Sequence, residues 1–126
     1  MAFDSIQVRF KDTKHIESPF PNTRVVPFVD SYLEVLRSVV EDVKTEYFWF
    51  FANFVELKFN FDLNYIPEQH EKDQMHVWYA THPKAGLNKE GNVFLIPTKQ
   101  FKEQMNDIKF LRDFMDINYH PQDLFF

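Results

Sequence analysis

Apolar and polar residues alternate near the start of the chain, where residues 5–10 read Ser-Ile-Gln-Val-Arg-Phe. Alternation with a period of two is typical of a strand with one buried face, so a short strand is predicted here. Three prolines then fall between Ser18 and Pro27. This segment is predicted to be an extended connection, with a second short strand over residues 24–26.

A helical period replaces the alternation after Asp30. Ser31 and Glu34 have the spacing of a capping box, and the negative charge of Asp30 favours a helix N-terminus at this point. The pattern predicts an amphipathic helix over roughly residues 31–44. Its apolar side consists of Tyr32, Leu36, Val39, Val40 and Val43.

The most apolar segment of the chain follows this helix, over residues 47–54. Both alternating faces are apolar through Phe51, which is typical of a central strand that is covered on both sides. We therefore predict that this segment lies at the centre of a sheet. Trp49 and Phe50, which point to opposite faces, should both be buried.

Further strands are predicted on either side of a long polar loop that holds both glycines of the chain. Residues 75–81 and 92–96 form the two arms of an antiparallel hairpin around that loop. Residues 59–63 are predicted to be a short edge strand, and residues 117–119 a last short strand.

A second helix is predicted to begin with Thr98 as its N-cap. An apolar stripe continues through it, with a break expected near Asn106 and Asp107. The stripe consists of Phe101, Met105, Ile108 and Leu111.

These elements predict an α+β fold in which an N-terminal amphipathic helix packs on a mixed, mainly antiparallel sheet of about four to six strands. A strongly bent sheet resembling the small Sm type of barrel is an open alternative. With 126 residues, the chain has the usual length of one domain, so residues 1–126 are predicted to form a single domain. Sixteen Phe and an aromatic fraction of 18% predict a core packed largely by rings.

Charge and cysteine content narrow the functional classes. The net charge is −5 and the charges are interspersed, which argues against duplex nucleic acid as a partner, because that binding needs clustered Lys and Arg. Cys is absent, which excludes disulfides and thiolate chemistry and favours a cytoplasmic location. The sequence predicts neither a signal peptide nor a membrane-spanning segment.

The five histidines do not predict a metal site. No pair has the i, i+4 spacing of helical ligands, and His76 and His82 on one strand would lie roughly 20 Å apart. Carboxylate pairs such as Glu68 with Glu71, or Asp113 with Asp116, lie in segments with a solvated composition. Phosphate loops, dinucleotide fingerprints and nucleophile elbows are also missing, so neither a cofactor nor a metal is predicted.

Aromatic and basic residues occur together around the predicted hairpin loop. Trp78, Tyr79, Lys84 and Lys89 are the candidate ligand-binding residues, because rings beside cations can stack on single-stranded bases or on sugars. The competing interpretation is that Trp78 belongs to the core and the lysines solubilise a turn.

Four short motifs carry a resemblance to a known family. They are residues 45–49 (Thr-Glu-Tyr-Phe-Trp), 59–62 (Phe-Asn-Phe-Asp), 75–78 (Met-His-Val-Trp) and 91–97 (Gly-Asn-Val-Phe-Leu-Ile-Pro). In these motifs the chain resembles a family of uncharacterised proteins of tailed phages, particularly phages of marine cyanobacteria, and of marine metagenomes. Some larger members look like GT-A glycosyltransferases, in which an Asp-x-Asp motif holds a metal and a sugar nucleotide.

The position that matches the Asp-x-Asp motif here reads Ala52-Asn53-Phe54. The resemblance therefore implies that metal-dependent transfer is absent, and no catalytic residue is carried over. We predict a non-enzymatic, phage-type binding or assembly protein. One alternative is a reduced glycosyltransferase-like module that binds a sugar or a sugar nucleotide, and a second is a module that binds single-stranded nucleic acid.

Self-association is the remaining prediction. The sequence ends in Leu124-Phe125-Phe126, and large apolar side chains at a terminus must either fold back on their own domain or cover a neighbour. With so many rings already in the interior, some apolar surface should stay outside. A homo-oligomer, or a contact with another viral protein, would bury it.

Overall fold

A computed structural model describes residues 3–11, 13–57, 61–79, 93–121 and 124–125 of the chain. The strands are β1 (Asp4–Arg9), β2 (Thr23–Pro27), β3 (Tyr47–Ala52), β4 (Glu56–Leu57), β5 (Met75–Tyr79), β6 (Val93–Pro97), β7 (Ile117–Pro121) and β8 (Leu124–Phe125). The α-helices are α1 (Tyr32–Val39) and α2 (Thr98–Gln104), and the 3-10 helices are η1 (Val40–Asp42), η2 (Gln69–Glu71) and η3 (Leu111–Asp113).

Six strands form one open sheet in the order β2-β1-β3-β6-β5-β7. β1 pairs in parallel with β2 and β3, β7 pairs in parallel with β5, and β6 pairs antiparallel with β3 and β5. The fold is therefore mixed α/β with a mostly parallel sheet. The prediction of a mixed sheet is confirmed, whereas the mainly antiparallel α+β arrangement is wrong and the sheet does not close into a barrel.

The prediction failed because the parallel pairs join strands that are distant in sequence. The antiparallel pair β5–β6 joins consecutive strands, and the hydrophobic pattern predicts it as a hairpin. The parallel pairs join segments that need long crossover connections, such as Met75 with Ile117. Local patterns do not indicate which distant strand becomes the neighbour.

β3 lies in the interior of the sheet, hydrogen-bonded to β1 on one side and β6 on the other. Trp49 is 1% exposed and Phe50 is fully buried, so the prediction that both faces of this strand are covered is confirmed. Because successive side chains of a strand point to opposite faces, β3 contributes rings to two separate cores.

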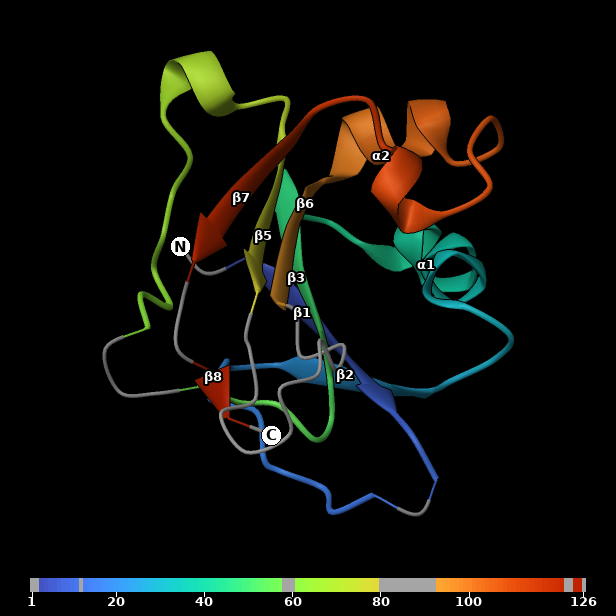
Figure 1. The fold of residues 1–126 in the computed structure, drawn as a ribbon, viewed down its shortest axis with the longest axis vertical. Coiled ribbons are helices and arrows are strands. Elements are labelled where there is room, and N and C mark those ends of the chain that lie inside the picture. Colours follow the sequence, from blue (N-terminus) through green and yellow to red (C-terminus); the bar gives the residue numbers. More distant parts are fainter. Residues whose placement is uncertain (1–2, 12, 58–60, 80–92, 122–123, 126) are drawn as a thin grey trace.

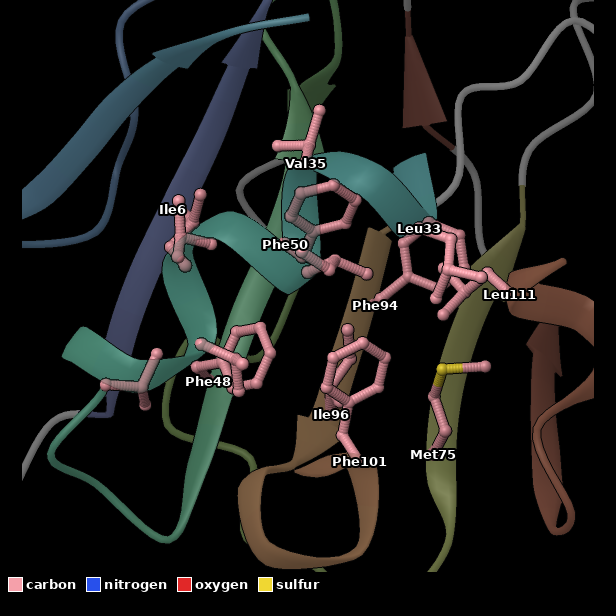
Figure 2. Close-up of a cluster of buried hydrophobic side chains, with 14 of the residues drawn as sticks. Ile6, Leu33, Val35, Phe48, Phe50, Met75, Phe94, Ile96, Phe101 and Leu111 are labelled. Atoms are coloured by element: carbon pink, nitrogen blue, oxygen red, sulfur yellow. The ribbon is translucent and has the colours of Figure 1, made fainter. Parts of the chain in front are cut away.

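One face of the sheet, which we call the helix face, is covered by α1 and α2 (Figure 1). Side chains from the strands and from α1 point toward one another in this core (Figure 2). Its buried residues are Ile6, Val8, Val26, Leu33, Val35, Leu36, Val39, Val40, Val43, Phe48, Phe50, Met75, Val77, Phe94, Ile96, Phe101, Leu111 and Phe114.

The other face, which we call the loop face, is covered by the β1–β2 connection and by residues 61–74, which we call the strap (Figure 1). The strap has no regular structure longer than the 3-10 turn η2. The buried residues of this core are Phe20, Tyr47, Trp49, Phe51, Ala52, Val55, Phe61, Trp78, Val93 and Leu95. The prediction of an aromatic interior is most evident here.

The predicted start of the first helix is confirmed, because the Ser31 side chain caps α1 by accepting a hydrogen bond from the Glu34 amide at 3.2 Å. α1 itself is shorter than predicted, and the 3-10 turn η1 continues it. Thr98 is the first residue of α2 and not its cap. Its hydroxyl donates instead to the Thr45 carbonyl at 2.9 Å, which ties α2 to the start of β3.

The second helix ends where the break was predicted, just before Asn106. The apolar stripe continues after this break without a helix, and Leu111 is buried as the first residue of η3. An edge strand over residues 59–63 is not formed by Phe61 to Leu63, while residues 58–60 lie outside the described ranges.

The last described strand folds back on the same chain. β8 pairs antiparallel with β4, and the two form a separate small sheet. The backbone of Leu124 and Phe125 therefore pairs within the chain, and self-association stays a prediction. Among the described helices, none has the length and apolar character needed to cross a bilayer.

Candidate functional site

A cleft of about 430 Å³ opens on the helix face, beside the β5–β7 end of the sheet. Its floor is apolar and buried. It is made by Leu33 at the start of α1, by Met75 and Val77 on β5 and by Phe94 on β6. Leu33, Met75 and Phe94 lie close together in Figure 2.

Aromatic side chains stand at the mouth of this cleft. Phe28, Phe110 and Tyr119 line it and are 38%, 53% and 57% exposed, respectively. They come from three segments that are distant in sequence: the β2–α1 connection, the segment before η3, and β7. The cleft therefore offers flat apolar surfaces to a ligand without any rearrangement of the core.

Charged side chains complete the lining, with Asp30 just before α1 and with Lys109 and Arg112 near η3. The guanidinium carbon of Arg112 lies 4.7 Å from the centre of the Phe110 ring, a cation–π contact. The neighbouring Asp113 carboxylate accepts a hydrogen bond from the Phe110 amide at 3.1 Å. Within the described part of the chain, neither Lys109 nor Arg112 forms an ion pair.

The backbone at one end of the cleft has an uncommon conformation. Asp30 has a φ of 56°, in the left-handed region that non-glycine residues seldom adopt and that Asp tolerates better than most. This conformation turns the chain from β2 into α1, so that Ser31 can cap the helix. Phe28 is placed at the mouth of the cleft by the same turn.

The opposite side of β5 and β7 carries a pair of histidines. His76 Nδ1 lies 2.8 Å from His120 Nε2, and His76 is fully buried. The two rings are within 25° of coplanar, and their centres are 5.1 Å apart, much further than the two nitrogens. The rings therefore meet edge to edge, as in a hydrogen bond, and leave no room for an ion between them.

The carbonyl oxygen of Glu71 determines where the protons lie. It is 3.3 Å from His76 Nε2 and can only accept, so His76 Nε2 carries the proton. His76 Nδ1 must then accept, and His120 Nε2 donates to it. Both imidazoles are neutral in this arrangement, and a further proton would enter at His120 Nδ1.

Burial lowers the pKa of both His76 and His120, because desolvation penalises the imidazolium form. The carboxylate of Glu71 opposes this effect in both residues, and for His76 the neighbouring imidazole lowers the pKa further. The pair thus favours the neutral state.

Aromatic rings enclose the pair. His120 stacks on Trp78, with ring centres 4.6 Å apart and planes at 14°. Tyr65 of the strap contacts both histidines and Trp78, and its hydroxyl donates to the Glu71 carboxylate at 3.4 Å. Burial raises the pKa of the Tyr65 phenol, so it stays protonated as a donor.

A second tyrosine ties the strap to the sheet. The Tyr47 hydroxyl donates to the Lys72 carbonyl at 2.6 Å. Burial, with a contribution from Glu46, raises the pKa of Tyr47 to about 12. Together with the bond from His76 to Glu71, this contact holds the strap over the loop face.

Of the four predicted ligand-binding residues, Trp78 alone has a described side chain, and it does not line the cleft. Trp78 is buried on the loop face against Trp49 and Phe61, which places its ring in the core. Lys84, Lys89 and the Tyr79 side chain lie outside the described residues. The four residues as a set remain a prediction.

Sequence reasoning missed both the cleft and the histidine pair. The pair depends on the parallel register of β5 and β7, in which Trp78 lies opposite His120. The strands were predicted, but their pairing was not. The available signal was the alternation on β7, which puts Tyr119 and His120 on opposite faces of the sheet.

Asn53, which the predicted resemblance would align with the glycosyltransferase acids, has a structural role. Asn53 is fully buried directly after β3, and its side-chain Oδ1 accepts a hydrogen bond from the Phe10 amide at 2.9 Å. Its amide nitrogen donates to the Thr13 hydroxyl at 3.1 Å. In the described ranges, no cluster of three or more His, Cys, Asp or Glu side chains is arranged to hold a metal ion.

No protein-family model, curated protein or solved structure matches this chain. The resemblance to phage proteins therefore stays a prediction.

Proposed function

We propose that this protein is a non-catalytic binding module, and that its site is the cleft between α1, β5, β7 and the segment before η3. The observation that carries the proposal is a preformed hollow with a buried apolar floor and a half-exposed aromatic rim. Its volume of about 430 Å³ is in the range of small-molecule sites. The fitting ligand is a small molecule with a flat apolar ring.

The polar groups of the cleft favour binding over catalysis. Lys109 and Arg112 are exposed at the rim. The Ser31 hydroxyl already caps α1. A nucleophile beside a general base is the usual requirement for covalent catalysis, and the described lining of this cleft contains no such pair.

A protein-observed NMR titration with neutral naphthalenemethanol tests this proposal. The expected shifts are in amides of residues 109–113 and 31–33, because both segments line the cleft. Phe110→Ser should weaken binding by about fivefold or more, since it removes one apolar stacking surface.

Met115→Ser is the matched control. Met115 is 82% exposed and lies in the same part of the chain, but it does not line the cleft. Met115→Ser should leave the affinity for naphthalenemethanol unchanged. Shifts that map to the loop face, or equal losses in the two variants, would contradict the proposal.

A sugar or sugar nucleotide remains the alternative ligand, since its rings could also stack on the aromatic rim. Calorimetric titration with a panel of nucleotide sugars, with and without manganese, separates the two. Binding without a metal dependence would place these compounds among the ligands of the cleft. Sub-millimolar, manganese-dependent binding would instead favour the glycosyltransferase-like module.

Self-association and single-stranded nucleic-acid binding are independent proposals. Light scattering at tens of micromolar tests the first, and a monomeric mass would exclude the homo-oligomer. Fluorescence anisotropy at low salt tests the second, because such binding depends strongly on ionic strength.

A further inference from the structure

The charges at the mouth of the cleft are arranged unevenly. Lys109 and Arg112 lie within four consecutive residues of one wall, while the Asp30 carboxylate belongs to a different segment. The protein as a whole is acidic, with 19 acidic and 14 basic residues. The two positive side chains on this wall therefore contrast with the negative net charge of the whole chain.

Within the described residues, neither of these cations forms an ion pair, although two arginines elsewhere do. Arg24 pairs with Asp42, and Arg37 pairs with Glu34. Asp113 lies next to Arg112 in sequence, but its carboxylate accepts from the Phe110 amide, and Arg112 has no carboxylate partner in the described chain. The charge of Arg112 is thus available to a ligand.

The ring of Phe110 orients the guanidinium. Arg112 lies over this ring with its guanidinium carbon 4.7 Å from the ring centre. A guanidinium donates hydrogen bonds only around the edge of its plane, where its fork geometry matches a carboxylate, sulfonate or phosphate group. Stacking on an aromatic ring leaves these edge donors free.

We infer that the cleft selects an anionic ligand, a flat apolar ring that carries an acidic group, with the ring on the aromatic rim and the acidic group at Arg112 and Lys109. This inference rests on the proposed function, because it names the chemical class of the ligand for the same cleft. The floor of Leu33, Val77 and Phe94 excludes water from the ring side. The acidic group stays near solvent, where the two cations are.

A charge series on one ring system tests the inference with the intact protein. Naphthalenesulfonate, naphthalenemethanol and naphthylmethylammonium have the same ring and carry a negative, a neutral and a positive substituent. We expect the anion to bind about tenfold more tightly than the neutral probe, since a hydrogen bond to a charged group contributes this much. The cation should bind most weakly.

Variants identify the side chains that produce the difference. Arg112→Gln should reduce the affinity for naphthalenesulfonate by about fivefold to tenfold and have a clearly smaller effect on the neutral probe. Lys109→Gln should have a smaller effect in the same direction. Arg24→Gln is the matched control, because it removes an arginine that is outside the cleft and should change neither affinity.

The outcomes separate the two proposals. Equal binding of the anion and the neutral probe would overturn the charge selectivity and leave the cleft as a binding site. Tighter binding of the cation would also overturn it and would point to Asp30. If none of the three probes binds at millimolar concentration, the proposed function itself is wrong.

Discussion

The two faces of the sheet are covered in different ways. The helix face is buried by α1 and α2, which form backbone hydrogen bonds within each helix, and most of its buried side chains are aliphatic. The loop face is buried by irregular segments over a mainly aromatic core. Such segments form only some of the backbone hydrogen bonds they need within themselves, so other partners must satisfy the rest.

Several buried polar side chains lie on the loop face, where the irregular segments need hydrogen-bond partners. On the loop side, Gln7 donates to the Ile16 carbonyl, Asn53 binds the Phe10 amide, and His76 binds the Glu71 carbonyl. All three side chains are almost completely buried. The helices thus cover their face mainly with apolar contacts, supplemented by bonds from Arg37 and Thr98 to backbone carbonyls. The irregular cover depends on hydrogen bonds from several buried polar side chains.

The largest expected effect tests whether both faces are true cores. Trp49→Ala and Phe50→Ala remove buried rings on opposite faces of β3, and each should lower the free energy of unfolding by about 3–5 kcal/mol. Urea denaturation at neutral pH measures both. If Trp49→Ala cost less than half as much as Phe50→Ala, the loop face would be a loose cover and not a second core.

Asn53→Ala should have the next largest effect, a loss of about 2–3 kcal/mol in the free energy of unfolding. The substitution leaves the Phe10 amide without its partner and removes the contacts with Thr13. Thr13→Val is the matched control, because it removes only the hydroxyl. It should cost about 1 kcal/mol or less.

Amide hydrogen exchange gives Asn53→Ala a local readout. Exchange of the Phe10 amide should accelerate more than exchange of amides in α1, which belongs to the other face. Uniform acceleration would indicate a general loss of stability and would contradict the specific role of Asn53.

The histidine pair makes the loop face sensitive to acid. Burial lowers the folded-state pKa of His76 and His120, so the unfolded chain binds protons first as the pH falls through about 6.5. Stability should be highest above that pH, fall as the pH approaches the folded-state pKa values, and then level off. Solvent screening reduces the share of the partly exposed His120.

The free energy of unfolding, measured by urea titration, should be about 1 kcal/mol lower at about pH 5.5 than at about pH 7.5. His120→Gln should reduce this difference. His70→Gln is the control, since it removes an exposed imidazole that lies outside the pair. An unchanged pH dependence in His120→Gln would show that the pair does not contribute to it.

Sequence patterns predicted the elements whose causes are local. The capping of α1 by Ser31, the two buried faces of β3 and the β5–β6 hairpin all follow from neighbouring residues. Each depends on spacing of a few residues or on a direct connection. The break after α2 also follows from a local change in pattern.

The site could not be predicted in the same way. The cleft joins Phe28, Phe94 and Phe110, and the histidine pair joins His76 with His120. These contacts depend on which strands become parallel neighbours, and that choice is made by packing between distant segments. The role of Trp78 was equally ambiguous, because its neighbours in sequence are compatible with a ligand-binding ring and with a core ring. The structure places the Trp78 side chain in the core.

The smallest expected effect concerns the helix face, where the backbone needs little help from side chains. Ser31→Ala removes the hydroxyl that accepts the Glu34 amide, and this should lower the free energy of unfolding by about 1 kcal/mol. Ser38→Ala is a matched control in the same helix, because its exposed hydroxyl bonds only to the Val35 carbonyl and caps no free amide. Ser38→Ala should change the free energy of unfolding by no more than about 0.5 kcal/mol.

Ser31 also lines the cleft, so Ser31→Ala should affect ligand binding as well as stability. A frayed first turn would move Leu33 in the floor and weaken the binding of neutral naphthalenemethanol, while Ser38→Ala would not. If Ser31→Ala lowered the free energy of unfolding as much as Asn53→Ala, the contrast would be wrong between a helical cover held mainly by apolar contacts and an irregular cover held by hydrogen bonds.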